Sequence, residues 1–374
     1  MKIIHYLSIA VSLALVSCTS IEDVTWPKLD DTDNNNNNNN IAKVQLTRVD
    51  LDSVYTSASG FSKVINGRIC FFDKYLSKLF IYSIDGKIIS SKLGFGNGPQ
   101  ETVIRNAATF CSSANGKIAI LGSNTDYQII SEEGIAEPYE TLTYLPDKKG
   151  KSDNFYNYSY AWNNMQSIYN NGFIYISMDC EHPSFNYFET TDKILKQKKH
   201  IGVIDVDTRE VNMLSCGYPE IYHDNPYKYS SVNLINFDLY SNERFIINFE
   251  ATPEIYVCNV KGTPKSVFGA KGKQIDQDYI KVKSYDMFDG YFENRKNKGR
   301  YSFLKYIDED NLIFRSYIKG SQYDDDGLQV YKNEKIVGDI SVPKGFYVIG
   351  KVGEAYISNI YFDESGGYFY KFNL

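Results

Sequence analysis

Two short segments place a histidine next to a carboxylate and close to a proline. They are residues 179–183 (DCEHP) and 222–226 (YHDNP), in a chain of 374 residues with only four histidines. If the two loops meet on one face of the fold, His182, His223 and Asp224 can form an acid–base or metal site, because imidazole titrates near neutral pH. The alternative is that both histidines are exposed loop residues.

A second candidate is the aromatic segment 155–164 (FYNYSYAWNN), in which rings alternate with amides and small residues. Tyr158, Tyr160 and Trp162 offer flat faces to a sugar ring or a peptide. The same alternation is typical of a strand whose tyrosines point into the core. Both interpretations stay open.

Other signatures of chemistry are weak. The run 323–327 (YDDDG) offers carboxylates to calcium, but it lacks the full calcium-loop pattern, and a solvated hairpin turn is the alternative. Neither zinc-type spacing of His and Cys nor a Gly-x-Ser-x-Gly elbow occurs. We therefore predict no catalytic residue, no metal ligand and no cofactor, with calcium as the open alternative. Lysines and arginines between 271 and 300 predict a basic surface insertion, or a site for an anionic glycan or acidic partner.

The elements that must position these loops are short strands. Residues 66–101 form the clearest unit, with strands at 68–73, 79–82 and 87–93. Asn66-Gly67 precedes the first strand and Asp85-Gly86 precedes the third, and such pairs favour tight hairpin turns. Similar units follow near residues 117, 173, 244, 303 and 345, without a convincing amphipathic helix between them.

A repeat of this kind predicts an all-β fold, a six-bladed β-propeller over residues 41–374. Seven blades, or paired β-sandwiches, are the alternatives. Residues 44–54 alternate between apolar and polar and precede the first full unit. We expect them to close the ring by pairing with the C-terminal strands, because an open ring leaves exposed sheet edges.

The first unit ends in a glycine-rich loop, residues 94–101 (GFGNGPQE). A nucleotide-binding loop needs a helix after it, which the sequence does not indicate, so we expect a sharp turn between blades. The order of turn, strands and loop resembles the Bacteroidetes lipoproteins with a TolB-like six-bladed β-propeller. The residues that carry this resemblance are Gly94, Gly96, Gly98, Pro99 and Glu101. It implies the propeller fold and an envelope location, and no activity.

The N-terminus resembles an export signal. Residues 1–17 combine Lys2 with an apolar stretch too short to span a bilayer, and Leu15-Val16-Ser17-Cys18 resembles a lipobox. We expect cleavage before Cys18, whose thiol then receives lipid and holds the protein at the outer membrane, on its periplasmic or its outer surface. Residues 18–40 contain seven consecutive asparagines and are predicted to be a disordered tether.

Composition limits the partners. The formal net charge of −6 disfavours nucleic acid, whose phosphates favour a basic face. Among the five cysteines besides Cys18, Cys70 and Cys258 lie in apolar strands and are predicted to be core thiols, and Cys180–Cys216 is the candidate disulfide. The predicted partners are the membrane, through the lipid anchor, and a protein or glycan.

Three functions remain open at this point. The first is non-catalytic binding of a protein or glycan on one propeller face. The second is metal-assisted hydrolase or lyase chemistry on a glycan or lactone in the central channel, and the third is a purely structural role. Three or more carboxylates, amides or histidines converging at the channel mouth would favour the enzyme, whereas an apolar, tyrosine-rich lining would favour binding. Fold alone does not decide between them.

Overall fold

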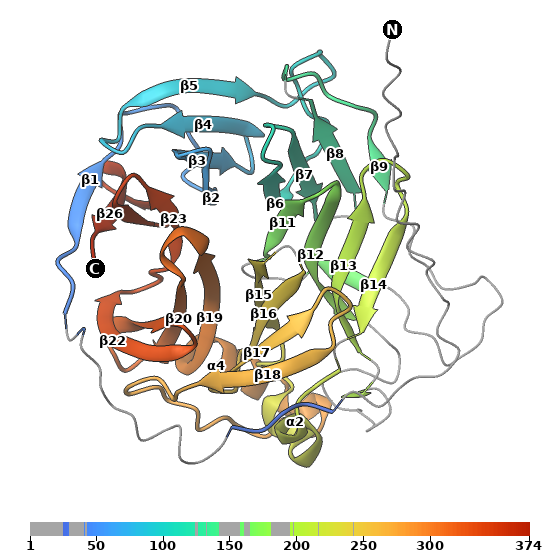
Figure 1. Cartoon of the computed structure of the whole chain (residues 1–374), viewed down its shortest axis with the longest axis vertical. Coiled ribbons are helices and arrows are strands. Elements are labelled where there is room, and N and C mark those ends of the chain that lie inside the picture. Colours follow the sequence, from blue (N-terminus) through green and yellow to red (C-terminus); the bar gives the residue numbers. More distant parts are fainter. Residues whose placement is uncertain are drawn as a thin grey trace, which may run out of the picture.

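Short strands joined by tight turns make up most of the fold. The computed structural model describes residues 25–29, 41, 43–123, 126–131, 133–141, 158–160, 165–180, 195–196, 198–215, 217–241 and 243–374. They form six antiparallel sheets of four or five strands, arranged as blades around a central axis (Figure 1). The predicted all-β, six-bladed β-propeller is confirmed.

The first three blades follow one another along the chain. Blade 1 consists of β2 (Gly60–Ile65), β3 (Arg68–Asp73), β4 (Lys78–Tyr82) and β5 (Ile88–Leu93). Blade 2 consists of β6 (Ala107–Ser112), β7 (Ile118–Gly122), β8 (Asp126–Ile130) and β9 (Glu140–Thr141). Blade 3 consists of β10 (Tyr158–Tyr160), β11 (Ser167–Asn170), β12 (Phe173–Cys180), β13 (Lys199–Asp205) and β14 (Val211–Ser215).

The other three blades complete the ring. Blade 4 consists of β15 (Ile235–Ser241), β16 (Arg244–Phe249), β17 (Glu254–Asn259) and β18 (Pro264–Gly269). Blade 5 consists of β19 (Lys298–Ile307), β20 (Leu312–Gly320), β21 (Asp325–Lys332) and β22 (Lys335–Pro343). Blade 6 consists of β23 (Val348–Val352), β24 (Ala355–Ser358), β25 (Tyr361–Asp363), β26 (Gly366–Phe372) and the N-terminal strand β1 (Thr47–Asp50).

The pairing of β1 with β26 closes the ring, as the sequence predicts. The two strands are antiparallel, with Thr47 opposite Lys371 and Asp50 opposite Tyr368. The regular strand is shorter than the alternating segment 44–54. The backbone turns away after Leu51, whose N–H donates to the carbonyl of Gly367 at 2.8 Å.

Asn-Gly pairs set the register of the hairpins beside the axis. Asn66 and Gly67, between β2 and β3, have φ values of 48° and 66°. Positive φ at both positions defines the turn that suits the twist of a two-residue hairpin. Gly86 has a different role, because a Cβ there would lie 2.2 Å from the carbonyl oxygen of Asp50. Glycine at this position therefore lets the β4–β5 turn touch the closing strand.

The core lies between neighbouring blades, since each sheet has two apolar faces to cover. Between blades 1 and 2, the rings of Phe72 and Phe110 are 5.6 Å apart, and both side chains are buried. Burying one such side chain stabilises the fold by about 1.5–3 kcal/mol. In the described part of the chain, the short helices α2 (Glu220–Asp224), α3 (Pro226–Tyr229) and α4 (Phe288–Asn297) lie in the connections on either side of blade 4 (Figure 1).

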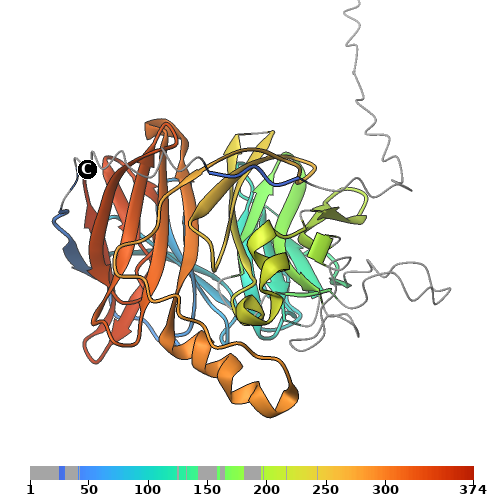
Figure 2. The same cartoon turned by 90° about the horizontal axis from the view of Figure 1, so that it is seen from below.

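Residues 25–29 lie against the propeller. The indole of Trp26 packs edge-on against Phe249 and Tyr256 of blade 4, with ring centroids 5.3 and 4.4 Å apart. Lys28 forms an ion pair with Glu220 of α2. Within the predicted tether, residues 25–29 thus contact blade 4 and α2, and the disorder predicted for residues 18–40 stays a prediction. Figure 2 shows residues 25–29 at the opposite end of the blades from α4.

The buried cysteines are reduced. Cys70, Cys111 and Cys258 are buried thiols, which confirms the prediction of core thiols at positions 70 and 258. Burial raises the pKa of the Cys111 thiol to about 11. The side chains of Cys180 and Cys216 lie outside the described residues, so their disulfide stays a prediction. Within the described ranges, no helix is long and apolar enough to cross a membrane.

Candidate functional site

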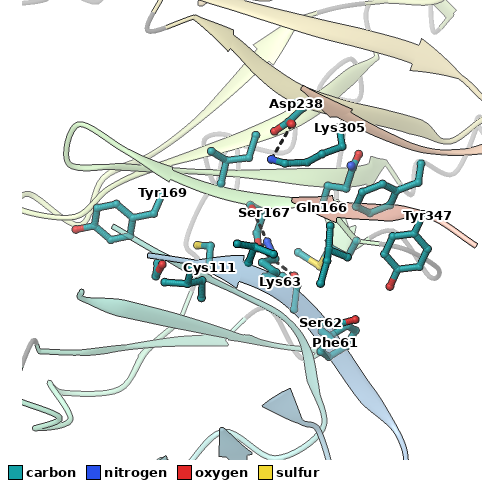
Figure 3. Close-up of a pocket in the computed structure, with 18 of the residues that line it drawn as sticks. Phe61, Ser62, Lys63, Cys111, Gln166, Ser167, Tyr169, Asp238, Lys305 and Tyr347 are labelled. Carbon is teal, nitrogen blue, oxygen red and sulfur yellow. Dashed lines mark hydrogen bonds and ion pairs between the residues drawn. The ribbon is translucent and has the colours of Figure 1, made fainter. Parts of the chain in front are cut away.

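All six blades contribute to a cavity on the propeller axis. Its volume is about 270 Å³, and its walls come from the inner strands β2, β6, β11, β15, β19 and β23 (Figure 3). We call this cavity the central channel. Its polar lining includes Lys63, Cys111, Gln166, Ser167, Asp238 and Lys305.

The charged groups of the central channel are two ammoniums and one carboxylate. Lys305 Nζ lies 2.9 Å from Asp238 Oδ2. Lys63 Nζ donates to the Ser167 carbonyl oxygen at 2.5 Å and approaches the Ser167 hydroxyl at 3.2 Å (Figure 3). Burial lowers the pKa of the Lys63 ammonium to about 8, because an enclosed cation loses its hydration.

The amide in the central channel joins blades to one another. Gln166 Nε2 donates to the Leu304 carbonyl oxygen at 3.0 Å, and Gln166 Oε1 accepts from the Phe237 N–H at 2.5 Å. One side chain of blade 3 thereby satisfies backbone groups of blades 5 and 4. Both ends of this amide are used by the fold, so it is not offered to a ligand.

The composition of the central channel favours binding over acid–base or metal chemistry. Asp238 is the one carboxylate among the lining residues that the structure describes. In the same part of the chain, no group of three or more His, Cys, Asp and Glu side chains is placed to hold a metal ion. Aromatic rings line the cavity as well, and Phe303 stacks on Tyr347 with centroids 4.3 Å apart.

The predicted histidine sites are only partly described. His223 lies in α2, where its Nε2 is 3.1 Å from the Tyr218 carbonyl oxygen, and Asp224 is exposed at the end of the same helix. His182 lies outside the described residues. The predicted meeting of the two histidine loops therefore stays a prediction.

The aromatic segment begins as a strand. Residues 158–160 form β10, with Tyr158 opposite Cys180 and Tyr160 opposite Met178 of β12. This backbone agrees with the strand interpretation of the pattern. Trp162 lies outside the described residues, and the side chains of Tyr158 and Tyr160 are not described either. Their proposed role in binding a sugar or peptide stays a prediction.

The glycine-rich loop connects blade 1 to blade 2 by a tight turn. The Gly98 N–H donates to Glu101 Oε2 at 2.8 Å, and a Cβ at Gly96 would lie 2.0 Å from that carboxylate. The Pro99 carbonyl oxygen accepts from the Ala136 N–H of blade 2 at 3.0 Å. The Gly94 carbonyl oxygen accepts from the Thr102 N–H across the turn at 2.9 Å. The Glu101 carboxylate is thus hydrogen-bonded within the loop. The next regular element is the strand β6, not a helix.

The acidic run 323–327 is engaged by protein donors. Lys319 Nζ lies 2.5 Å from Asp325 Oδ2 and lowers the pKa of that carboxyl group. Asp326 accepts from the N–H groups of Lys319 and Gly345 at 3.2 and 2.8 Å. These carboxylates hold the β20–β21 hairpin and the following turn together, instead of converging on one point.

A second candidate site is an aromatic surface around α4. We call it the α4 surface, and it consists of Ile280, Tyr285, Met287, Phe288, Tyr291 and Phe292. Tyr285 is 74% exposed and Phe292 is 52% exposed. The rings of Tyr285, Phe288 and Tyr291 stack in sequence, with neighbouring centroids 5.6 and 5.9 Å apart. Figure 2 shows α4 projecting from one end of the blades.

Buried polar contacts hold α4 in place. Asn294 is fully buried, and its Oδ1 accepts from the Ile280 N–H at 2.8 Å. Its Nδ2 donates to the Ser231 hydroxyl at 3.0 Å. Arg295 pairs with Glu250 of blade 4 at 2.5 Å. The α4 surface is therefore presented on a fixed helix.

Part of the positive charge that the sequence places in region 271–300 is paired with nearby carboxylates. Arg295 and Lys298 are paired with Glu250 and Asp276. The exposed charges of this region are of both signs. They are Lys271, Lys273, Lys281, Lys283 and Lys296, with Asp278, Asp286, Asp289 and Glu293. Sequence reasoning missed the aromatic surface, although Phe288, Tyr291 and Phe292 show the spacing of one helix face.

The six sheets, the closing strand and the central channel define the class of protein as a six-bladed β-propeller. Among solved structures it is similar to a member of the DUF4221 family from Bacteroides vulgatus, with 16% identity, a TM-score of 0.62, and coverage of 88% of this chain and 98% of that one. It is also similar to a protein of Bacteroides fragilis named as a candidate for export, with 11% identity, a TM-score of 0.49, and coverage of 88% and 94%.

No family profile matches the sequence, and no curated protein matches it either. At these identities the likeness to solved structures shows the fold alone. The lipoprotein character and the TolB-like assignment that the sequence resemblance implies therefore stay predictions.

Proposed function

We propose that this chain is a lipid-anchored envelope protein that binds a protein partner through the α4 surface without catalysing a reaction. The observation that carries this proposal is the exposure of Tyr285 and Phe292 on a helix whose own position is fixed by buried contacts. Large exposed aromatic clusters on a soluble body mark interaction sites.

The chemistry of the α4 surface supports a protein rather than a glycan as the partner. Tyr, Phe and Met are enriched in protein interfaces, where an aromatic centre is surrounded by a polar rim. The α4 surface has this composition, with charges of both signs around the rings. It projects from the blades (Figure 2), whereas small-ligand and sugar sites are concave and carry converging polar groups.

The position of the predicted lipid anchor also supports the α4 surface as the binding site. Cys18 lies seven residues before residue 25, and seven extended residues reach at most about 25 Å. Because residues 25–29 and α4 lie at opposite ends of the blades, a lipid on Cys18 would leave the α4 surface facing away from the membrane (Figure 2). This orientation argues for a partner outside the membrane.

The alternative function, a metal-assisted hydrolase or lyase, has less support. It needs several converging acids or histidines. The described lining of the central channel offers Asp238, which is already paired with Lys305.

The proposal is tested by cross-linking in cells. A photo-reactive residue at position 292 is expected to give one discrete protein adduct, whereas the same residue at Ile89, exposed on blade 1, gives none. The partner, identified and purified, should bind the double variant Tyr285→Ser, Phe292→Ser at least roughly tenfold more weakly than wild type, because buried aromatic anchors dominate interfaces. Tyr75→Ser, which changes another exposed tyrosine, in blade 1, should bind as wild type does.

Two results would contradict the proposal. One is an affinity of the purified partner that does not change in the double variant. The other is a polysaccharide adduct in place of a protein, which would favour the glycan alternative.

The lipid anchor is a separate prediction. Cys18→Ala should abolish labelling by an acyl analogue and move the protein from the membrane to the soluble fraction, since no acyl chain then holds it. Cys70→Ala removes a core thiol instead and should keep the label. Retention of label in Cys18→Ala would rule out this anchor.

A further inference from the structure

The charges that point into the central channel do not balance. Lys63 and Lys305 each bring an ammonium, and Asp238 brings the one carboxylate of the described lining. That carboxylate is already occupied. Its Oδ2 lies 2.9 Å from Lys305 Nζ and accepts from the Tyr306 N–H at 2.8 Å. One positive charge, on Lys63, is left without an anion.

Lys63 is held in place by neutral acceptors only. Its Nζ contacts the carbonyl oxygen and the hydroxyl of Ser167, at 2.5 and 3.2 Å. In the described part of the chain no carboxylate lies within ion-pair distance of this ammonium. An ammonium has three N–H donors, so these contacts leave one for a further acceptor. Lys63 is partly buried. A cation that loses part of its hydration without an anionic partner is destabilised, and an anion in the cavity would offset that cost.

We propose that the central channel binds a small organic monoanion, whose anionic group contacts Lys63 and whose apolar part lies against Phe303 and Tyr347. These two rings stack with centroids 4.3 Å apart, at 29° to each other, and line the same cavity. A volume of about 270 Å³ accommodates a molecule of the size of benzoate. This site goes beyond the proposed function, which concerns the α4 surface.

The pH dependence of binding follows from the groups that face Lys63. From the surrounding strands these are Cys111, Tyr169, Asp238, Lys305 and Tyr347. Burial raises the pKa of the Cys111 thiol to about 11 and raises the pKa values of both tyrosines, so these groups stay neutral near pH 8. Burial lowers the pKa of Lys63 to about 8, whereas a bound anion would raise it. Above about pH 8, binding must therefore take up a proton, and affinity falls by up to about tenfold per pH unit.

The test is calorimetric titration of the protein with benzoate, with its neutral analogue benzamide as the comparison. We expect benzoate to bind at about pH 7 and to bind several-fold more weakly at about pH 9. Benzamide should bind at least roughly tenfold more weakly than benzoate, as expected for the loss of a charge-assisted contact. Lys63→Met should weaken benzoate binding by at least the same factor and abolish its pH dependence. Lys92→Met makes the same change at an exposed position of β5 and should leave binding unchanged.

Several results would overturn this proposal. They are the absence of benzoate binding to wild type, equal binding of benzamide and benzoate, or equal benzoate binding by Lys63→Met and wild type. Tighter binding of inorganic phosphate than of benzoate, in the same titration, would overturn the assignment of an organic monoanion. If Lys63→Met does not fold, two other measurements test the proposal. Lys63→Arg keeps the charge and should keep benzoate binding, and wild type should bind benzoate more weakly as the pH rises.

Discussion

Replacement of Arg315 by methionine is expected to destabilise the propeller by about 1–3 kcal/mol, the usual cost of leaving a buried hydrogen-bond acceptor without its donor. Arg315 belongs to β20 of blade 5, and its fully buried side chain lies between blades 4 and 5. Its guanidinium donates to the carbonyl oxygens of Pro253 and Ala270 at 2.5 and 2.6 Å, and to Gln329 Oε1 at 2.9 and 2.5 Å. Methionine fills a similar volume but donates to none of these acceptors. Ala270 and Gln329 keep donors from Gln329 Nε2 and the Tyr331 hydroxyl at 3.2 and 2.9 Å, whereas the Pro253 carbonyl oxygen loses the guanidinium.

Urea unfolding of the purified protein measures this effect. Lysine at position 315 keeps the charge but loses the planar fork that reaches several acceptors at once, so Arg315→Lys should also destabilise strongly. Arg68→Met makes the same change at an exposed position of β3 and should stay within about 0.5 kcal/mol of wild type. A variant Arg315→Met within about 1 kcal/mol of wild type would show that the network is not a main link between these blades.

Removal of the closing strand is expected to abolish the single cooperative unfolding transition. A chain that begins at Asp52 lacks β1 and exposes the edge of β26, and unpaired edges recruit other strands. Val49, opposite Phe369, and Leu51 are lost from the core between blades 6 and 1 as well. We expect such a chain to self-associate and to expose apolar surface to a dye.

The matched control is a chain that begins at Ile41. It also lacks Trp26 and the N-terminal segment but keeps β1, so it should remain monomeric with one sharp transition. Light scattering and a thermal melt distinguish the two chains. A monomeric chain from Asp52 that melts within a few degrees of the control would show that blades 1 and 6 hold the ring closed by themselves.

The outer parts of the blades were predictable because their signals are local. Asn66-Gly67 specifies a turn by its own backbone preference, and the strands after it are short apolar runs. The inner strands β2, β6, β11 and β15 were not predicted. Residues of these strands face the channel on one side and the core on the other, so β2 (GFSKVI) mixes polar and apolar types without a clear pattern.

The central channel forms only when the ring closes, so no local sequence pattern predicts it. Lys63 meets Ser167 across 104 residues of sequence, and nothing near either residue indicates the contact. The α4 surface was missed for a related reason. The charges of the region suggested a basic patch, but Arg295 is neutralised by Glu250, which lies 45 residues earlier. Pairing across blades decides which charges remain exposed.

The closure of the ring by β1 and β26 also sets the order of events when the protein is made. β1 is synthesised early, but it can pair only after β26, near the C-terminus, has been synthesised. In an exported chain, blade 6 therefore cannot form until the whole polypeptide has crossed the inner membrane, because contacts so distant in sequence form late. If this chain is exported, as its N-terminus predicts, it would stay open during transit, which suits passage as an extended polypeptide. Its period of greatest exposure to aggregation would then fall in the compartment where it finally folds.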